Sequence, residues 1–158
     1  MDNWTLASKI LDEEEREALY RLLGPIVKNL DGRISMLEIE GYHGRDGGDI
    51  WFCRRPGQAI TSVMVTLVKR YTSGLNVMCM THGAGDLQDW TLDALLRLES
   101  IAREKGCSKL QIDGCDNGGD NMTCGPGIGW DKIPGGGWRE YSRSMEKDLV
   151  SSKFKKED

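Results

Sequence analysis

The fold is organised around the stretch from Asn76 to Ala102, which contains an apolar segment, a glycine turn and a long amphipathic helix. Val77–Met80 is a continuous apolar run of the length typical of a buried strand. His82–Gly85 (His-Gly-Ala-Gly) follows and is predicted to be a turn, since glycine adopts positive φ at little cost. An amphipathic helix is then predicted, because apolar residues recur with the helical period. They are Leu87, Trp90, Thr91, Ala94, Leu95, Leu98, Ile101 and Ala102.

The two ends of this helix carry capping signals. Asp86 or Asp89 is expected to cap the N-terminus, because a carboxylate accepts hydrogen bonds from the exposed N–H groups of the first turn. Gly106 is expected to end the helix.

A strand that passes through a glycine turn into a helix N-terminus is a frequent anion site, because unpaired amides and the helix dipole point outward there. The candidate cofactor-binding residues are therefore His82, Gly83, Ala84, Gly85 and Asp86. The histidine is also a candidate catalytic base or phosphate donor, since imidazole titrates near neutral pH. The alternative is a plain turn that holds two turn glycines and a surface histidine.

The chain before this stretch begins with a helical region. Residues 4–11 form a first strand or an extended lead-in, and Asp12 with Glu15 has the spacing of a capping box. The apolar residues that follow repeat with the helical period, and Pro25 divides them into two short helices or bends one. Ile34–Ile39 favours a further helical turn.

Three strand-like segments come next, joined by short turns: residues 49–54, 59–68 and 75–80. Short turns make neighbouring strands antiparallel. Residues 109–113 form a strand after the long helix, parallel to 75–80 because a right-handed helical crossover joins the two. The expected fold class is therefore single-domain α/β over residues 1–150, with a mixed, mostly antiparallel sheet flanked by helices. Residues 151–158 are a polar charged tail.

The C-terminal part is rich in glycine. Residues 114–129 contain six glycines and one proline and are expected to form a long loop, which is usually functional or orders on binding. Residues 138–149 are expected to form a last strand. Glu140 and Tyr141 on it are candidate catalytic groups, but strand alternation places them on opposite faces, so at most one of them faces a site.

Composition excludes several classes of function. The net charge is -4 and the basic residues are scattered, so no direct contact with nucleic acid is expected. No apolar run reaches the roughly 20 residues that a membrane-spanning helix needs. The N-terminus lacks the basic-then-apolar order of a signal peptide, so the chain is not expected to be secreted.

Five cysteines without a secretion signal predict reduced thiols. Three of them lie in or beside apolar segments and are expected in the core: Cys53, Cys79 and Cys107. Cys115, Cys124 and His82 lack the paired spacing of a zinc site, so no metal is predicted.

Two further kinds of residue receive a structural interpretation. His43 lies in a polar, glycine-rich loop and is expected to be exposed and without a role. The tryptophans at positions 51, 90, 130 and 138 are expected to pack in the core rather than to cage a ligand.

The order of strand, glycine turn, long helix, strand, aromatic-rich region and last strand resembles the C-terminal half of the Gcn5-related N-acetyltransferase (GNAT) superfamily. His82–Gly85 resembles the Arg-Gly-x-Gly loop of that family, which in active members holds the pyrophosphate of acetyl-CoA. Gly137-Trp138 resembles the family's terminal Gly-Phe pair. The resemblance implies a GNAT fold, and acetyl-CoA as the cofactor of an active member.

The divergent GNAT-like proteins of tailed bacteriophages are more similar still. The resemblance runs from Ile34 to Leu149. The matching segments, in chain order, are Asp49–Trp51, Val65–Val68, Gly83–Gly85 with Trp90, Ala102–Cys107 and Gly129-Trp130.

Three departures separate the chain from active GNAT enzymes. His82 replaces the arginine of the phosphate loop, and the glutamine that precedes that loop is missing. Trp130 lies near the position of the tyrosine general acid, and an indole does not donate its proton as a phenol does. The loop after residues 109–113 is also longer than in the family.

The resemblance and these departures together imply a degenerate, non-catalytic GNAT-fold bacteriophage protein without a cofactor. It is expected to act as a virion-associated or host-interacting accessory protein with a protein partner, in the virion or the host cytoplasm. The alternative is an active acetyl-CoA-dependent N-acetyltransferase that modifies an amine on a protein or a small molecule.

Overall fold

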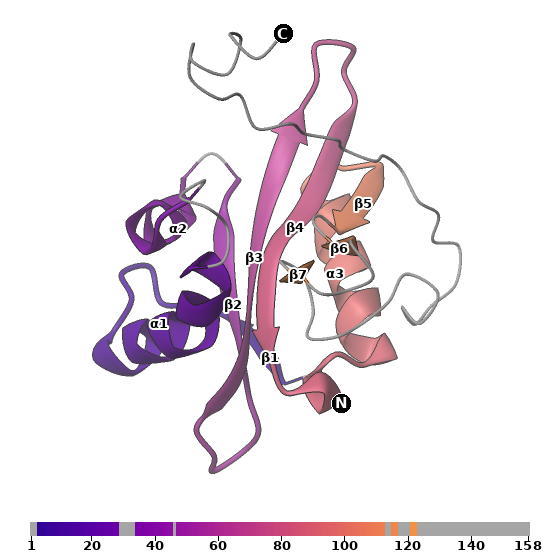
Figure 1. The fold of residues 1–158 in the computed structure, drawn as a ribbon. Helices are drawn as coiled ribbons and strands as arrows, with labels where there is room; N and C mark the ends of the chain where they lie inside the picture. Colours follow the sequence, from indigo (N-terminus) through magenta and orange to yellow (C-terminus); the bar gives the residue numbers. More distant parts are fainter. Residues whose placement is uncertain (1–2, 29–33, 46, 113–114, 117–120, 123–158) are drawn as a thin grey trace, which may run out of the picture.

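The computed structural model describes residues 3–28, 34–45, 47–112, 115–116 and 121–122. Figure 1 shows a central sheet with helices α1 and α2 on one face and helix α3 on the other. In chain order the elements are β1 (Trp4–Leu6), α1 (Glu13–Lys28), α2 (Met36–Tyr42), β2 (Asp49–Arg54), β3 (Ile60–Arg70), β4 (Asn76–Gly85), the 3-10 helix η1 (Leu87–Asp89), α3 (Leu92–Glu104), β5 (Lys109–Ile112), β6 (Cys115–Asp116) and β7 (Asn121–Met122).

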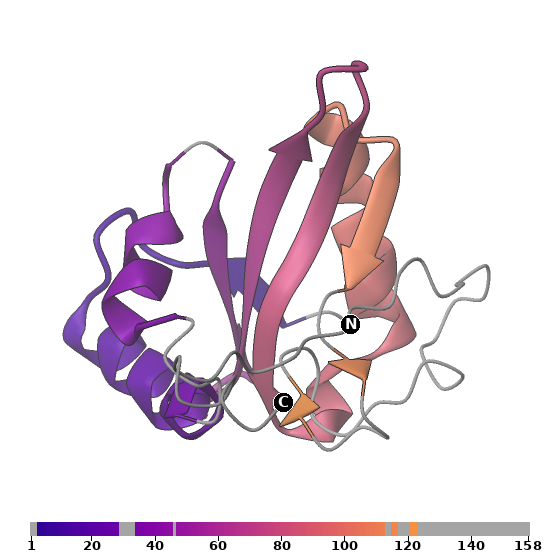
Figure 2. The same ribbon diagram turned by 45° about the horizontal axis from the view of Figure 1, so that its top comes forward.

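Strands β1 to β5 form one five-stranded sheet in sequence order. The pairs β1–β2, β2–β3 and β3–β4 are antiparallel, and β4–β5 is parallel. The β2–β3 and β3–β4 hairpins both extend beyond the helices in Figure 1, and Figure 2 shows the β3–β4 hairpin from a second direction. The mixed α/β sheet expected from the sequence is confirmed. Strands β6 and β7 pair with each other within residues 114–129, so the expectation of a plain loop is wrong at those positions.

Two hydrophobic cores lie on the two faces of the sheet. Neighbouring residues of β3 alternate between them: Val63 and Val65 pack with α1, and Met64 packs on the side of α3. Because both faces are covered, the central strands are nearly continuous apolar runs. The core on the side of α3 contains Trp4, Trp51, Cys53, Met64, Val68, Met78, Met80, Trp90, Ala94, Leu98, Ala102, Cys107 and Ile112.

The start of α1 confirms the predicted capping box. The Glu15 N–H donates to Asp12 Oδ1 at 2.8 Å, and the Asp12 N–H donates to Glu15 Oε1 at 3.0 Å. The other oxygen of Glu15 accepts from the Ser8 N–H at 2.9 Å, which ties the lead-in from β1 to the helix. Pro25 lies inside one continuous helix rather than between two.

The end of α3 confirms the predicted stop at Gly106. This glycine has φ = 78° and follows the C-cap residue Lys105. The Gly106 N–H donates to the Arg103 carbonyl at 3.0 Å, and the Cys107 N–H donates to the Ala102 carbonyl at 2.9 Å. These two bonds form a Schellman motif, which explains why the helix ends here and the chain turns into β5.

His43 joins three segments of the α1–α2 side, so the expectation that it is exposed and without a role is wrong. The Ile50 N–H donates to His43 Nδ1 at 2.9 Å, and His43 Nε2 lies 2.9 Å from the Ser8 carbonyl. A backbone N–H only donates and a carbonyl only accepts, so Nε2 carries the proton. The half-buried ring therefore links the end of α2 to the lead-in before α1 and to β2.

Replacing His43 with alanine is expected to lower the free energy of unfolding by about 1–2 kcal/mol, because the N–H of the fully buried Ile50 loses its acceptor. Urea unfolding followed by circular dichroism measures the change. Leu37→Ala on the same helix is the matched control, since the Leu37 side chain is 76% exposed. Equal stabilities of the two variants would contradict the bridging role.

Candidate functional site

The His82–Gly85 segment is part of strand β4, so the predicted turn is wrong. Its residues pair with β3 in the register Val65↔His82, Met64↔Gly83, Val63↔Ala84 and Ser62↔Gly85. Glycine is a strong local turn signal, but here the ladder with β3 overrides it. Of the predicted cofactor-binding residues, His82, Gly83, Ala84 and Gly85 therefore lie along the end of a strand, and Asp86 directly follows that strand.

Gly85 is required by the close approach of β4 to β3. Its φ is 131°, and a Cβ at this position would lie 2.2 Å from Ser62 Oγ and 2.4 Å from the Thr61 carbonyl oxygen. The absence of a side chain lets the Asp86 N–H donate to Ser62 Oγ at 2.9 Å. The packing of two strands thus accounts for this glycine without any ligand.

The helix α3 begins later than the sequence predicts, and neither predicted aspartate caps it. Thr91 is the N-cap residue, and its Oγ1 accepts from the Ala94 N–H at 3.1 Å. Asp86 instead caps η1, where its Oδ1 accepts from the Gln88 N–H at 3.0 Å. The residues that join β4 to α3 are Asp86, Leu87, Gln88, Asp89, Trp90 and Thr91, which contain no glycine.

Asp89 is the most buried carboxylate of this junction, with a side chain only 1% exposed. It accepts from Ser62 Oγ at 2.5 Å and from Thr61 Oγ1 at 2.6 Å, both on β3. Arg55, in the β2–β3 turn, donates to its other oxygen at 2.8 Å and lies 3.5 Å from Asp86. We refer to Asp89, Ser62, Thr61 and Arg55 as the Asp89 network.

The Asp89 network keeps this carboxylate ionised. Burial by itself raises the pKa of Asp89, but the hydrogen bonds from Ser62 and Thr61 and the charge of Arg55 together lower it below its ordinary value. No local sequence pattern indicates this cluster, because Ser62, Thr61 and Arg55 lie 27 to 34 positions away from Asp89.

A β-bulge lies in the middle of β4, next to the candidate residue His82. The register passes from Thr66↔Met80 directly to Val65↔His82, so Thr81 is the extra residue. A bulge reverses which face the following side chains point to. Met80 belongs to the core on the side of α3, whereas His82, opposite Val65, points toward α1 and α2. His82 is 8% exposed, so the alternative of a surface turn histidine is wrong.

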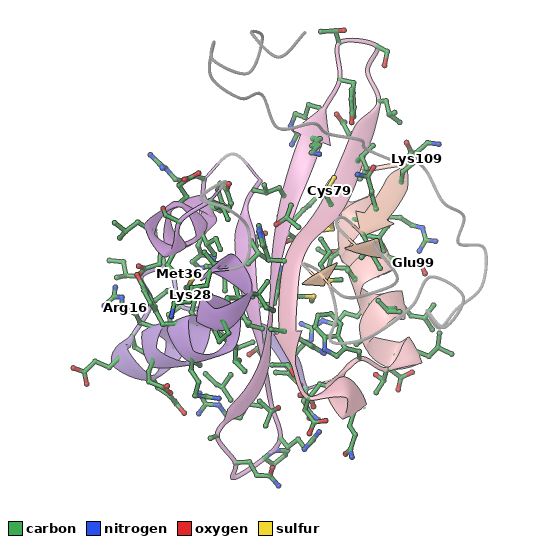
Figure 3. All side chains as sticks on the ribbon, viewed as in Figure 1. Arg16, Lys28, Met36, Cys79, Glu99 and Lys109 are labelled. Atoms are coloured by element: carbon green, nitrogen blue, oxygen red, sulfur yellow. The ribbon has the colours of Figure 1, made fainter. Side chains whose placement is uncertain are left out.

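Among the described residues, the pairing of the parallel strand β5 with β4 reaches as far as this bulge. Figure 3 shows Cys79 on β4 and Lys109 at the beginning of β5, on neighbouring strands. The described ladder between them ends at Met80↔Ile112, one position before Thr81. The bulge, His82 and the end of this pairing therefore meet at one place in the sheet.

The other predicted residues divide into two groups. Cys53, Cys79 and Cys107 are buried, as expected, and form no disulfide among the described residues. Trp51 and Trp90 are buried in the core, also as expected. Glu140, Tyr141, Cys124, Trp130, Gly137, Trp138 and the 151–158 tail lie outside the described residues.

The indole of Trp90 packs against Trp4, with ring centroids 4.9 Å apart and planes inclined by 57°. Its Nε1–H finds no hydrogen-bond acceptor among the described residues. Among the residues that the structure describes, no helix is long and apolar enough to span a membrane.

No protein-family model and no curated protein sequence matches the chain. Solved structures do match over nearly its whole length. An aminoglycoside acetyltransferase from an uncultured soil metagenomic sample has a TM-score of 0.63 at 10% identity, over 93% of this chain and 95% of its own. A GNAT family acetyltransferase from Staphylococcus aureus has a TM-score of 0.56 at 10% identity, over 92% and 97%. A ribosomal-protein-alanine N-acetyltransferase from Brucella melitensis has a TM-score of 0.55 at 14% identity, over 90% and 98%.

The chain therefore has the fold of GNAT acetyltransferases. At these identities the similarity establishes the arrangement of helices and strands, and the chemistry has to be argued from the residues of this chain.

Asp89→Asn is expected to lower the free energy of unfolding at pH 7 by about 2–3 kcal/mol, because the half-buried Arg55 loses its buried partner. The folded-state pKa of Asp89 is lowered, so its contribution is present above the unfolded pKa of about 4 and is lost as the pH falls through the folded value. Urea unfolding at several pH values should show the gap between wild type and variant closing below about pH 4. Asp86→Asn, 41% exposed, is the control with a small effect; a gap that does not depend on pH would contradict the assignment.

Gly85→Ala is expected to destabilise the protein by at least about 2 kcal/mol, because the added Cβ meets the backbone of Thr61 and Ser62 as well as an unfavourable φ. Gly74→Ala in the β3–β4 turn is the matched control. Its φ is also positive, at 93°, but a Cβ there has no atom within 4 Å, so only strain of about 1 kcal/mol is expected. Thermal unfolding compares the two, and equal losses would show that close packing is not the reason for Gly85.

Proposed function

We propose that this chain is a GNAT-fold protein that has lost the coenzyme-diphosphate site and acts through protein contacts rather than through catalysis. The observation that carries the proposal is the junction between β4 and α3. A glycine loop with free amides is what a diphosphate needs at this point of the fold. In this chain the junction contains two aspartates, and two of its amides, those of Asp86 and Gln88, donate to side chains of the protein itself.

The hydrogen bonds of the junction account for several amides in turn. The Asp86 N–H donates to Ser62 Oγ, the Gln88 N–H to Asp86 Oδ1 and the Ala94 N–H to Thr91 Oγ1.

The charges of the junction also disfavour a bound diphosphate. Arg55 is shared between Asp86 and Asp89, so the three groups together carry one negative charge. A diphosphate brought to this place would meet like charge and would have to displace internal bonds.

The resemblance to bacteriophage proteins supports the role of a phage-encoded accessory protein in the virion or the host cytoplasm, with a protein partner. The matched positions that the structure describes are positions of the scaffold. Trp51 and Trp90 are buried in the core, and Ala102 and Cys107 form the two ends of the Schellman bond that closes α3. Retaining these positions preserves the fold and does not restrict which protein partner is bound.

A second candidate function is acetyl transfer from acetyl-CoA to an amine. The observation that favours it is His82, buried at a bulge in the middle of β4 where the described pairing with β5 ends. Acetyl-CoA would be the cofactor, held along His82–Asp86, and a base at this place would take the proton of the attacking amine. The similar solved structures are acetyltransferases, which fits this candidate as well.

Calorimetric titration of acetyl-CoA into the full chain distinguishes the two. Active enzymes have KM values of up to about 1 mM, so we expect no saturable heat up to that concentration. Saturable binding would contradict the proposal. Binding that is lost in Gly83→Trp, but kept in a control that adds the same indole on the surface of α2 (Leu37→Trp), would place the cofactor at the end of β4.

Release of free coenzyme A thiol in the presence of amines then decides the reaction. Thiol release with binding would establish the second candidate, and binding without release would leave a coenzyme-binding protein that does not catalyse transfer. Circular dichroism of each variant separates loss of binding from loss of folding.

A further inference from the structure

His43 bridges a gap in the hydrogen-bond ladder between β1 and β2. We infer that this bridge is a proton-sensitive clasp. It holds the end of α2 and the lead-in before α1 against β2 while the imidazole is neutral, and it opens when the ring takes up a second proton. The inference concerns the scaffold, so it does not rest on the proposed function or on binding of acetyl-CoA.

The gap lies where the two strands separate. The last pair in register is Leu6↔Trp51, and one further bond follows, from the Ala7 N–H to the Ile50 carbonyl at 2.9 Å. In a regular antiparallel ladder the two residues of such a pair exchange both bonds, so the Ile50 N–H would return to the Ala7 carbonyl. Here the Ile50 N–H donates to His43 Nδ1 at 2.9 Å instead.

The other nitrogen of the ring returns to the segment that leaves β1. His43 Nε2 lies 2.9 Å from the carbonyl oxygen of Ser8, the residue directly after Ala7. The imidazole therefore takes the place of the missing backbone contact, with an acceptor on one side and a donor on the other. Because an amide N–H only donates and a carbonyl only accepts, both bonds form only when the ring is neutral and Nε2 carries its proton.

A second proton on the ring breaks this arrangement. The imidazolium has two N–H donors and no acceptor, so its Nδ1–H would face the N–H of Ile50. Ile50 is fully buried, and its N–H would then lack an acceptor in the closed clasp. The protonated ring therefore leaves β2. Imidazole titrates near neutral pH, which makes the clasp responsive to mild acid.

The ring itself, rather than a neighbouring charge, sets the state of the clasp. Both ring nitrogens contact backbone groups. Several charged neighbours have partners of their own: Glu15 accepts from backbone N–H groups, Glu40 binds Arg16, and Asp49 Oδ2 lies 3.0 Å from Lys105 Nζ. The titratable or charged side chains on the elements that meet here are Lys9, Asp12 and Glu15 before and in α1, Glu40, Tyr42 and Arg45 in and after α2, and Asp49 in β2.

Hydrogen exchange of the Ile50 amide in the full chain measures the opening of the clasp. The reference is His43→Gln, whose side-chain amide offers an acceptor and a donor that do not titrate between pH 5 and 8. Below the ordinary imidazole pKa of about 6.5, exchange in the wild type relative to the variant is expected to rise by up to about tenfold per pH unit, because protonation favours the open clasp. The fully buried Val65 on β3 is the internal control, whose ratio should not change with pH. A ratio for Ile50 that is independent of pH would overturn the inference.

Long-range proton–nitrogen-15 NMR of the wild type tests the geometry separately. At pH 8 the ring of His43 is expected to be the Nε2–H tautomer, and an Nδ1–H tautomer would contradict the clasp. His43→Gln assigns the signals, since the chain has only one other histidine. Should that variant not fold, exchange of Ile50 relative to Val65 within the wild type decides, because a ratio of the two amides that stays constant on acidification also overturns the inference.

Discussion

The buried carboxylate of Asp89 is the interaction on which this end of the molecule depends. It accepts hydrogen bonds from two hydroxyls of β3 and one guanidinium of the β2–β3 turn, while the carbonyl of the same residue accepts from Trp4 Nε1 at 2.9 Å. Arg97 of α3 in turn donates to the Trp4 carbonyl. Asp89 therefore joins the edge strand β1, strand β3 and the β2–β3 turn to the segment between β4 and α3. An ionised group is tolerated here because its oxygens are satisfied.

The hydrogen bonds between β4 and α3 stabilise the fold, and they use backbone amides that an anion site would need. In a GNAT fold the passage from β4 to α3 is the place where free amides are available to an anion. Here the hydroxyl of Thr91, the carboxylate of Asp86 and the hydroxyl of Ser62 use them. On the proposed function the junction does not also bind a diphosphate, because each internal bond uses a donor that the anion would need. His82 directly follows the bulge residue of β4 and does not belong to the Asp89 network.

Much of the fold could be predicted from the sequence, because the signals involved act over a few residues. The capping box of Asp12 and Glu15, the Schellman end at Gly106 and the strand at residues 49–54 appear in the structure as expected. The order of helices and strands then leaves few topologies, since a helical crossover makes β4 and β5 parallel. The candidate site was predicted less well: its residues were named, but its geometry was not.

Most of the helices and strands, their order and their apolar faces follow from local sequence signals, because propensity, periodicity and capping act over a few residues. The roles of His82–Gly85 and Asp89 depend instead on contacts with distant parts of the chain. Two glycines indicate a turn until β3 pairs with them, and an aspartate before a helix indicates a cap until hydroxyls from another strand compete for it. The position of a bulge likewise depends on the register of two strands, and that register fixes the face on which His82 lies.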